Sequence, residues 1–165
     1  MSGQLPCGHE FCKSCLAQLK EKGVAQTCPL CRKPLPPGLD KLYDLGCRML
    51  MKVKAEIDRS RPKDEEIKPW PALSAERQRA MDQAVAMMRE AAAQGHVRAQ
   101  FWCGGLYRLG HGVAQDPRLS FMYYDKAAKQ GHPVAQGCAA AFYKHGLSVT
   151  QNYQEARRLY ALASA

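Results

Sequence analysis

Ala93-Gln94-Gly95-His96 is echoed by Lys129-Gln130-Gly131-His132, 36 residues further along the chain. A period of this length is typical of helical repeat proteins, in which each unit is a pair of helices. The echo continues at the same offset through these pairs: Ala99-Gln100 and Ala135-Gln136, Leu106-Tyr107 and Phe142-Tyr143, Gly110 and Gly146, Val113 and Val149, Tyr124 and Tyr160. Upstream, Ala84 and Met88 stand where Ser120 and Tyr124 stand in the next unit. The sequence therefore predicts one helix of an earlier unit followed by two full units.

The residues at the unit boundaries predict where the helices end and begin. Glycine favours the left-handed conformation that closes many helices, and we expect this conformation at Gly95, Gly110, Gly131 and Gly146. Asp116 before Pro117, and Asn152 at the equivalent place, predict N-caps. Between layers we expect small residues to allow close approach and aromatic residues to fill the gaps, namely Ala99, Gly104, Ala135, Tyr107, Tyr124, Phe142 and Tyr160. We assign structural roles to the histidines of the repeats and to the small buried residues Cys103 and Cys138.

This pattern, from Ser74 to Ala165, resembles the Sel1-like repeat, an α/α-hairpin solenoid related to the tetratricopeptide repeats. The resemblance implies a mostly α-helical fold. It also implies a protein-protein interaction surface, because stacked hairpins leave a concave groove open to a substrate or partner protein. The sequence does not name that partner.

A second motif occupies the first part of the chain, where Cys7-Gly8-His9-Glu10-Phe11-Cys12-Lys13-Ser14-Cys15-Leu16 is followed by Cys28-Pro29-Leu30-Cys31. Six potential zinc ligands stand in this segment: Cys7, His9, Cys12, Cys15, Cys28 and Cys31. Zinc takes four ligands tetrahedrally, and Cys-x-x-Cys lets two thiolates reach one metal. The segment is therefore interpreted as a module built around zinc.

The spacing resembles the RING finger, whose ligands hold two zincs in an interleaved cross-brace. The resemblance implies one complete site made by Cys7, His9, Cys28 and Cys31, and an incomplete site with Cys12 and Cys15. Two interpretations stay open. Either the missing ligand pair belongs to sequence upstream of Met1, as in an incomplete gene model or an alternative start, or the protein keeps one zinc site and a remnant of the other.

If the module acts as its family does, the chain is a RING-type E3 ubiquitin transferase that works by positioning a ubiquitin-conjugating enzyme, with no catalytic residue of its own. The resemblance places Pro29 and Leu30 in the patch that touches this enzyme, and Arg32 where a cation bridges enzyme and ubiquitin. The alternative is a zinc-stabilised interaction adaptor without ligase activity.

Between the two motifs we expect a helix and a linker. Asp40 can cap a helix with an apolar stripe made of Leu42, Leu45, Met49, Val53 and Ile57. Pro62, Pro69 and Pro71 then mark a charged linker, with Trp70 as an anchor onto the repeats. The predicted division is residues 1–35 for the zinc module, 36–73 for helix and linker, and 74–165 for the repeats. Cys47 is interpreted as a buried core cysteine.

Composition narrows the function classes. The 165 residues include 24 Lys and Arg against 15 Asp and Glu, for a net charge of +9. The excess is spread along the chain without a basic stripe, so we expect no nucleic-acid partner. No apolar run approaches the ~20 residues that span a bilayer, and the N-terminus lacks a signal peptide pattern. These features favour a cytoplasmic or nuclear protein with no membrane partner, and they argue against a disulfide scaffold.

Overall fold

The computed structural model describes residues 2–4, 10–12, 38–60 and 72–164. The chain divides into two compact units, Met1–Leu42 and Tyr43–Ala165, and each unit is described by itself. In the first unit, β1 (Ser2–Gln4) pairs antiparallel with β2 (Glu10–Cys12), and Gly3 faces Phe11 in the register. Helix α2 (Leu39–Ser60) begins in this unit and continues into the second.

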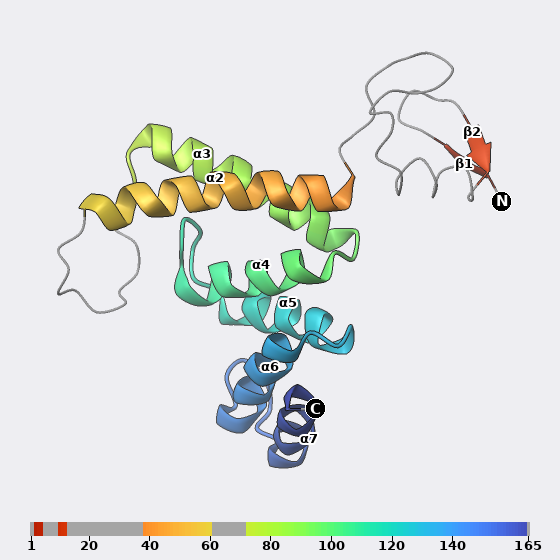
Figure 1. Cartoon of the computed structure of the whole chain (residues 1–165). Helices are drawn as coiled ribbons and strands as arrows, with labels where there is room; N and C mark the ends of the chain where they lie inside the picture. Colours follow the sequence, from red (N-terminus) through yellow and green to blue (C-terminus); the bar gives the residue numbers. More distant parts are fainter. Residues whose placement is uncertain (1, 5–9, 13–37, 61–71, 165) are drawn as a thin grey trace. The chain divides into compact units, whose positions relative to one another are not determined.

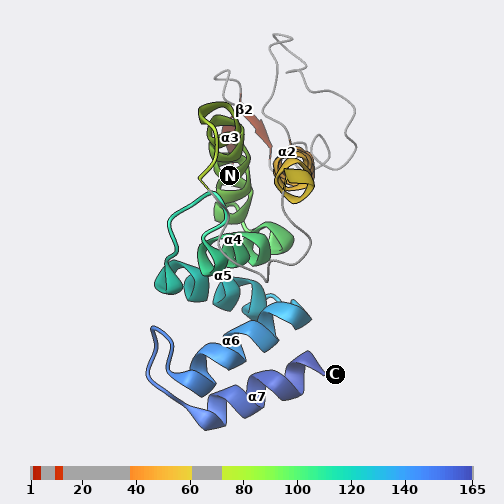
Figure 2. The same ribbon diagram turned by 90° about the vertical axis from the view of Figure 1, so that its left-hand side faces the viewer.

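The second unit is a stack of helices. After α2 come α3 (Ala75–Ala93), α4 (Val97–Leu109), α5 (Pro117–Lys129), α6 (Pro133–His145) and α7 (Tyr153–Ala163). From α3 onward each helix packs against the next one in the chain, so that α4 to α7 lie one below another (Figures 1 and 2). The prediction of a mostly helical solenoid is confirmed, and its division into one helix before two full units stays a prediction.

The predicted boundaries are confirmed by the backbone conformation. The four boundary glycines have positive φ: +97° at Gly95, +68° at Gly110, +84° at Gly131 and +66° at Gly146. Asp116 Oδ1 accepts hydrogen bonds from the backbone N–H groups of Arg118 and Leu119, and Asn152 Oδ1 accepts one from Glu155. The sequence could predict these residues because a left-handed turn favours glycine and an N-cap favours Asp or Asn.

Close approach between α4 and α5 depends on Gly104. A Cβ at this position would lie 2.7 Å from Cδ1 of Tyr124, whose ring is 2% exposed. The hydroxyl of Ser120 donates to the carbonyl of Gly104 at 2.9 Å. Tyr107, Tyr124 and Phe142 are buried as predicted, but Tyr160 is 43% exposed. Tyr160 was expected to fill a gap between two layers of helices. This expectation is wrong, because no described residue packs over Tyr160.

Helix α2 buries Leu42, Val53 and Ile57 of the predicted stripe, but not its other two members. Leu45 is exposed and Met49 is only half-buried, whereas Tyr43, Gly46 and Leu50 are buried. The reason is Gly46, whose absent side chain lets α2 approach α3: a Cβ there would lie 3.0 Å from Cγ of Met88. Because Met88 is the equivalent of Tyr124, α2 lies on α3 much as α4 lies on α5.

The face of α2 from Leu50 onward joins a core cluster with α3 and α4. Its buried members are Leu50, Val53, Ile57, Met81, Ala84, Val85 and Leu106. Arg77 of α3 also donates to Glu56 of α2 at 3.2 Å. The division of the chain at residues 35 and 73 stays a prediction, and Pro62, Pro69, Trp70 and Pro71 lie outside the described residues.

Candidate functional site

The zinc-ligand segment is only partly described. Cys12 ends strand β2, opposite Ser2 of β1. The other ligand candidates lie outside the described residues, as do the candidates for enzyme contact: Cys7, His9, Cys15, Cys28, Cys31, Pro29, Leu30 and Arg32. The donor set of thiolates and one imidazole is the set that tetrahedral structural zinc prefers, so the chemistry of these residues fits the metal. Within residues 38–60 and 72–164, no three His, Cys, Asp or Glu residues gather into a metal site.

The cysteines of the second unit are packing residues. Burial raises the pKa of the Cys103 thiol to about 12, and burial likewise raises the pKa of Cys138. Both thiols are therefore protonated at neutral pH and are poor metal ligands. Cys103 is buried as predicted, but Cys47 and Cys138 are half-buried because each stands at the edge of its helix-packing face. Cys138 packs at the margin of the core cluster around α5, α6 and α7.

Two histidines, His96 and His132, which the sequence analysis placed only in turns, connect successive units of the solenoid. We call the contacts of each of these histidines a joint. Nδ1 of His96 accepts a hydrogen bond from the backbone N–H of Ala99 at 3.1 Å, and Nδ1 of His132 accepts one from Ala135 at 3.2 Å. Each imidazole is thus the N-cap of the helix that follows it, α4 or α6. The sequence held one signal for this capping role: both histidines directly precede a predicted helix, at equivalent positions of the repeat.

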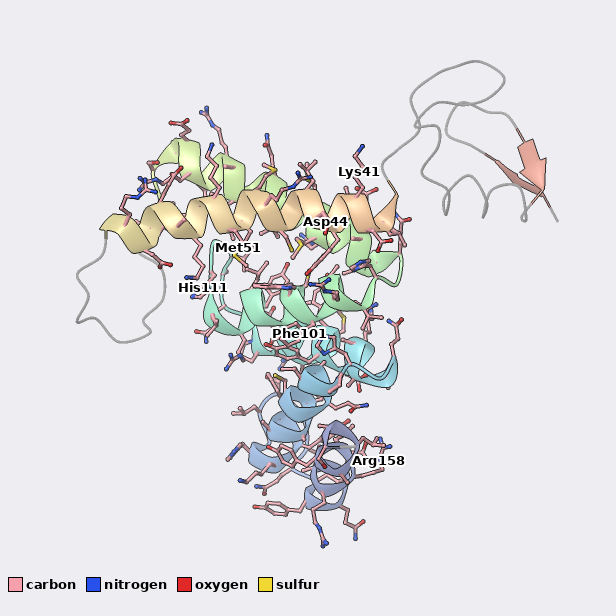
Figure 3. All side chains as sticks on the ribbon, in the orientation of Figure 1. Lys41, Asp44, Met51, Phe101, His111 and Arg158 are labelled. Carbon is pink, nitrogen blue, oxygen red and sulfur yellow. The ribbon has the colours of Figure 1, made fainter. Side chains whose placement is uncertain are left out.

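The same imidazoles stack on aromatic rings of the preceding first helix. His96 stacks on Tyr43 with centroids 4.5 Å apart, and His132 stacks on Phe101 at 4.6 Å. Figure 3 labels Phe101 on α4. Burial, with a further contribution from the Arg98 charge, lowers the pKa of His132 below its usual 6.5. Both effects favour the neutral ring, which Nδ1 needs in order to accept a hydrogen bond.

Buried glutamines connect successive units. Nε2 of Gln100 donates to the carbonyl of Ala92 at 3.1 Å, and Nε2 of Gln136 donates to that of Ala128 at 3.3 Å. Ala92 O also accepts from the backbone N–H of Gly95, and Ala128 O from that of Gly131, so each glutamine adds a further donor at the C-terminal end of α3 or α5. Gln130 also donates to Oε1 of Gln100 at 2.7 Å. The repeated Ala-Gln dipeptide is therefore a device that joins each hairpin to the next.

The first helices of the two units carry cations and no carboxylate. Arg98, Arg108 and Lys144 are exposed on α4 and α6, and neither helix contains Asp or Glu. The guanidinium of Arg98 lies over the Tyr43 ring, 5.1 Å from its centroid. A surface of this kind attracts acidic groups.

The repeats are matched by the model of the family described as Sel1 repeat, over residues 78–96, 97–132 and 136–165. The chain belongs to the Sel1-repeat family. Residues 2–31 of this Sel1-repeat protein match the C3HC4-type zinc finger, the RING finger, which implies zinc binding. Both resemblances inferred from the sequence are confirmed.

Among curated proteins, the Sel1-repeat chain is 31% identical to protein sel-1 homolog 2 of Homo sapiens over 90 residues, which cover 54% of the chain and 13% of that protein. Its zinc-finger segment is 58% identical over 31 residues to E3 ubiquitin-protein ligase rnf213-beta of Danio rerio, covering 19% of the chain and 1% of the relative. E3 ubiquitin-protein ligase TRIM68 of Mus musculus is 35% identical over 69 residues, which cover 32% of the chain and 14% of that protein. The chain thus spans a small fraction of the length of these relatives.

Solved structures support the fold of the Sel1-repeat unit. The Sel1 repeat protein from Oxalobacter formigenes aligns with a TM-score of 0.52 and 27% identity, covering 76% of this chain and 85% of that one. The protective antigen c5321 of uropathogenic Escherichia coli, which displays the SLR fold, aligns with a TM-score of 0.56 and 25% identity over 90% of this chain and 25% of its own. None of the helices in the described part of the chain has the length and apolarity needed to cross a membrane.

Proposed function

We propose that this protein is a RING-type E3 ubiquitin ligase in which the zinc finger recruits a ubiquitin-conjugating enzyme and the Sel1 repeats bind a substrate or partner protein. The observation that carries the proposal is the joining of a C3HC4 finger at residues 2–31 to Sel1 repeats in one chain. The identity of the finger segment to a named E3 ligase adds support. Such a chain brings the conjugating enzyme and the substrate together, which is catalysis by proximity.

In this proposal Cys7, His9, Cys28 and Cys31 hold one zinc, and Cys12 and Cys15 contribute to a second site. Zinc with four protein ligands supplies folding energy and leaves no open position for water. The finger is therefore a rigid docking surface. Pro29 and Leu30 would give it apolar contact area.

Arg32 follows the last ligand directly, where the forked guanidinium can donate to the conjugating enzyme and to ubiquitin at once. Such a contact holds the thioester-linked ubiquitin in a reactive orientation. Its effect would fall on the transfer step more than on docking.

For the repeats, we propose that the partner binds along the first helices through an acidic segment. Arg98, Arg108 and Lys144 supply the positive charge, and the absence of carboxylates on α4 and α6 removes repulsion. Exposed charges of this type raise association rates and depend on ionic strength. A triple exchange of these residues to Glu should therefore weaken partner binding and leave the fold intact.

The test is a ubiquitin-transfer assay with a panel of conjugating enzymes, run on this chain and on a longer one that includes any upstream codons of the gene. Ubiquitin chains formed by either protein, and lost in Cys28→Ser, would support the ligase function. The alternative function is a zinc-stabilised interaction adaptor without ligase activity. It would replace the ligase proposal if zinc is bound and no conjugating enzyme is stimulated by either protein.

A further inference from the structure

Helix α2 carries two straight rows of residues on opposite sides. The buried row alternates spacings of three and four residues and packs against α3 and the start and middle of α4: Tyr43, Gly46, Leu50, Val53 and Ile57. The second row repeats these spacings two residues later: Leu45, Arg48, Lys52, Ala55 and Arg59. A shift of two residues is a rotation of about 200° around a helix, so the second row lies opposite the buried one. All its members are exposed, and we call it the outer row.

The outer row has the spacing of a seam between two helices. Residues that alternate three and four apart stay on one side of a helix, so a second helix can lie along them for several turns. From Leu45 to Arg59 the outer row spans about 21 Å, because each residue of a helix rises about 1.5 Å. The buried row shows that α2 already packs against another helix through this spacing. The outer row is a second seam of the same kind, and no described helix covers it.

The cations of the outer row are not neutralised within the described part of the chain. No described carboxylate pairs with Arg48, Lys52 or Arg59. Nε of Arg48 donates to the backbone carbonyl of Asp44 at 3.4 Å, and not to its carboxylate. The outer row therefore presents three cations, spaced seven residues or less apart, to a partner.

Other charged residues of α2 do have partners. Lys54, which lies outside the outer row, pairs with Asp58 on the same helix. Glu56, which lies beside the outer row, accepts from Arg77 of α3 at 3.2 Å. Carboxylates on this helix are thus used elsewhere, and the charge of the outer row is left for a group from outside.

We propose that the outer row binds an acidic helix of another protein, with carboxylates opposite the three cations and an apolar side chain against Leu45, which is 37% exposed. Charge complementarity selects this occupant. A second copy of the chain does not fit, because two outer rows would bring like charges together. The outer row has no aromatic ring on which a base could stack, and its apolar member suits a protein better than a nucleic acid. This surface is separate from the residues used in the proposed ligase function.

The experiment measures fluorescence anisotropy of a labelled acidic peptide titrated with the full chain, with zinc present. The seam peptide is a helix of about 21 residues, three heptads, with Glu at the positions that face the cations and Leu opposite Leu45. A second peptide has the same composition in an order that spreads the Glu residues around the helix. One exposed ion pair contributes little, so specific binding requires several aligned pairs. We expect the seam peptide to bind about tenfold more tightly than the second peptide, and less tightly as salt rises above about 0.15 M.

Two matched variants locate the binding surface. The row variant combines Arg48→Gln, Lys52→Gln and Arg59→Gln, and we expect it to bind the seam peptide about tenfold more weakly. The control variant removes the same charge from exposed positions outside the outer row, and it should bind as the wild type does: Lys54→Gln, Arg118→Gln and Arg157→Gln. Circular dichroism melting checks that both variants are folded, and the comparison of the two peptides needs only the wild-type protein.

Three results would overturn the proposal. The first is no binding of the seam peptide, or equal affinity for the two peptides, which would show that α2 does not recognise a helix. The second is equal weakening in the row variant and the control variant, which would show attraction by net charge alone. The third is a single-stranded oligonucleotide that binds more tightly than the seam peptide and loses its binding in the row variant, which would assign the outer row to a nucleic acid.

Discussion

Tyr43 of α2 stacks on His96, the N-cap of α4, with ring centroids 4.5 Å apart. Phe101 and His132 repeat this relationship one layer later at 4.6 Å. Each joint couples two stabilising effects, because the same imidazole caps a helix and packs on a ring of an earlier helix. The first helix of each layer is therefore held at its N-terminus by a group that works only when it is neutral.

The His132 joint predicts a pH-dependent stability. The pKa of His132 in the folded protein is lowered below 6.5 by burial first and by the Arg98 charge as well. The unfolded chain then binds more protons near pH 6.5, so the contribution of His132 is complete above that value and is lost as the pH falls below it through the folded-state pKa. We expect the urea midpoint to decrease between pH 7.5 and 5.5. The decrease should be smaller in His132→Ala, and an equal decrease in both proteins would contradict the assignment.

At pH 7.5 the same variant measures the joint directly. His132→Ala removes an N-cap worth about 1 kcal/mol and a ring stack worth about 0.5–1.5 kcal/mol. His132→Asn restores a capping side chain without a ring, so it should recover part of the loss. Chemical unfolding monitored at the helical signal gives both values. His145→Ala, at the exposed end of α6, serves as the control and should change stability little.

Gly104→Ala should destabilise the repeats by about 1–3 kcal/mol, the usual cost of overpacking a core. The new Cβ would lie 2.7–2.9 Å from three atoms of the Tyr124 ring, which is itself held by its neighbours. Gly105→Ala is a matched control one residue away, because its Cβ would meet only the Tyr124 hydroxyl at 3.6 Å. That variant should be neutral or slightly stabilising, since alanine favours helix over glycine. Equal melting temperatures for the two variants would show that the α4–α5 contact is looser than the structure indicates.

The accuracy of the sequence-based predictions follows from how local each feature is. Gly110 and Asp116 were assigned correctly because turns and caps are set by a few neighbouring residues. The buried face of α2 was assigned correctly at Val53 and Ile57 but not at Leu45, because Gly46 has no apolar side chain to enter the pattern and its importance lies in its contact with Met88. The joints at His96 and His132 depend on rings in other helices, which no periodicity reveals.

Zinc should stabilise the finger and leave the repeats unaffected. Structural zinc in small domains contributes about 10–16 kcal/mol, more than a module of this size can gain from apolar burial. Cys28→Ser should therefore abolish the tightly bound zinc, expected at about one per chain, and unfold residues 1–35. Metal analysis and helical content by circular dichroism check the two parts. Loss of the helical signal of residues 74–165 in the variant or after chelation would contradict the predicted division of the chain.

Arg32→Ala tests the proposed ligase function itself. Arg32 is not a zinc ligand, so the variant should keep its metal content and its folding. It loses a forked cation at the surface where we propose that the conjugating enzyme and ubiquitin meet, and a contact made mainly in the reactive arrangement affects transfer more than docking. We expect the single-turnover rate of ubiquitin discharge to fall about tenfold, the equivalent of 1.4 kcal/mol, with a much smaller change in the affinity for the conjugating enzyme. Arg32→Lys should recover only part of the rate, since an ammonium group lacks the planar fork. Equal discharge rates with arginine and alanine, in a protein that transfers ubiquitin, would reject the bridging role and leave the zinc assignment intact.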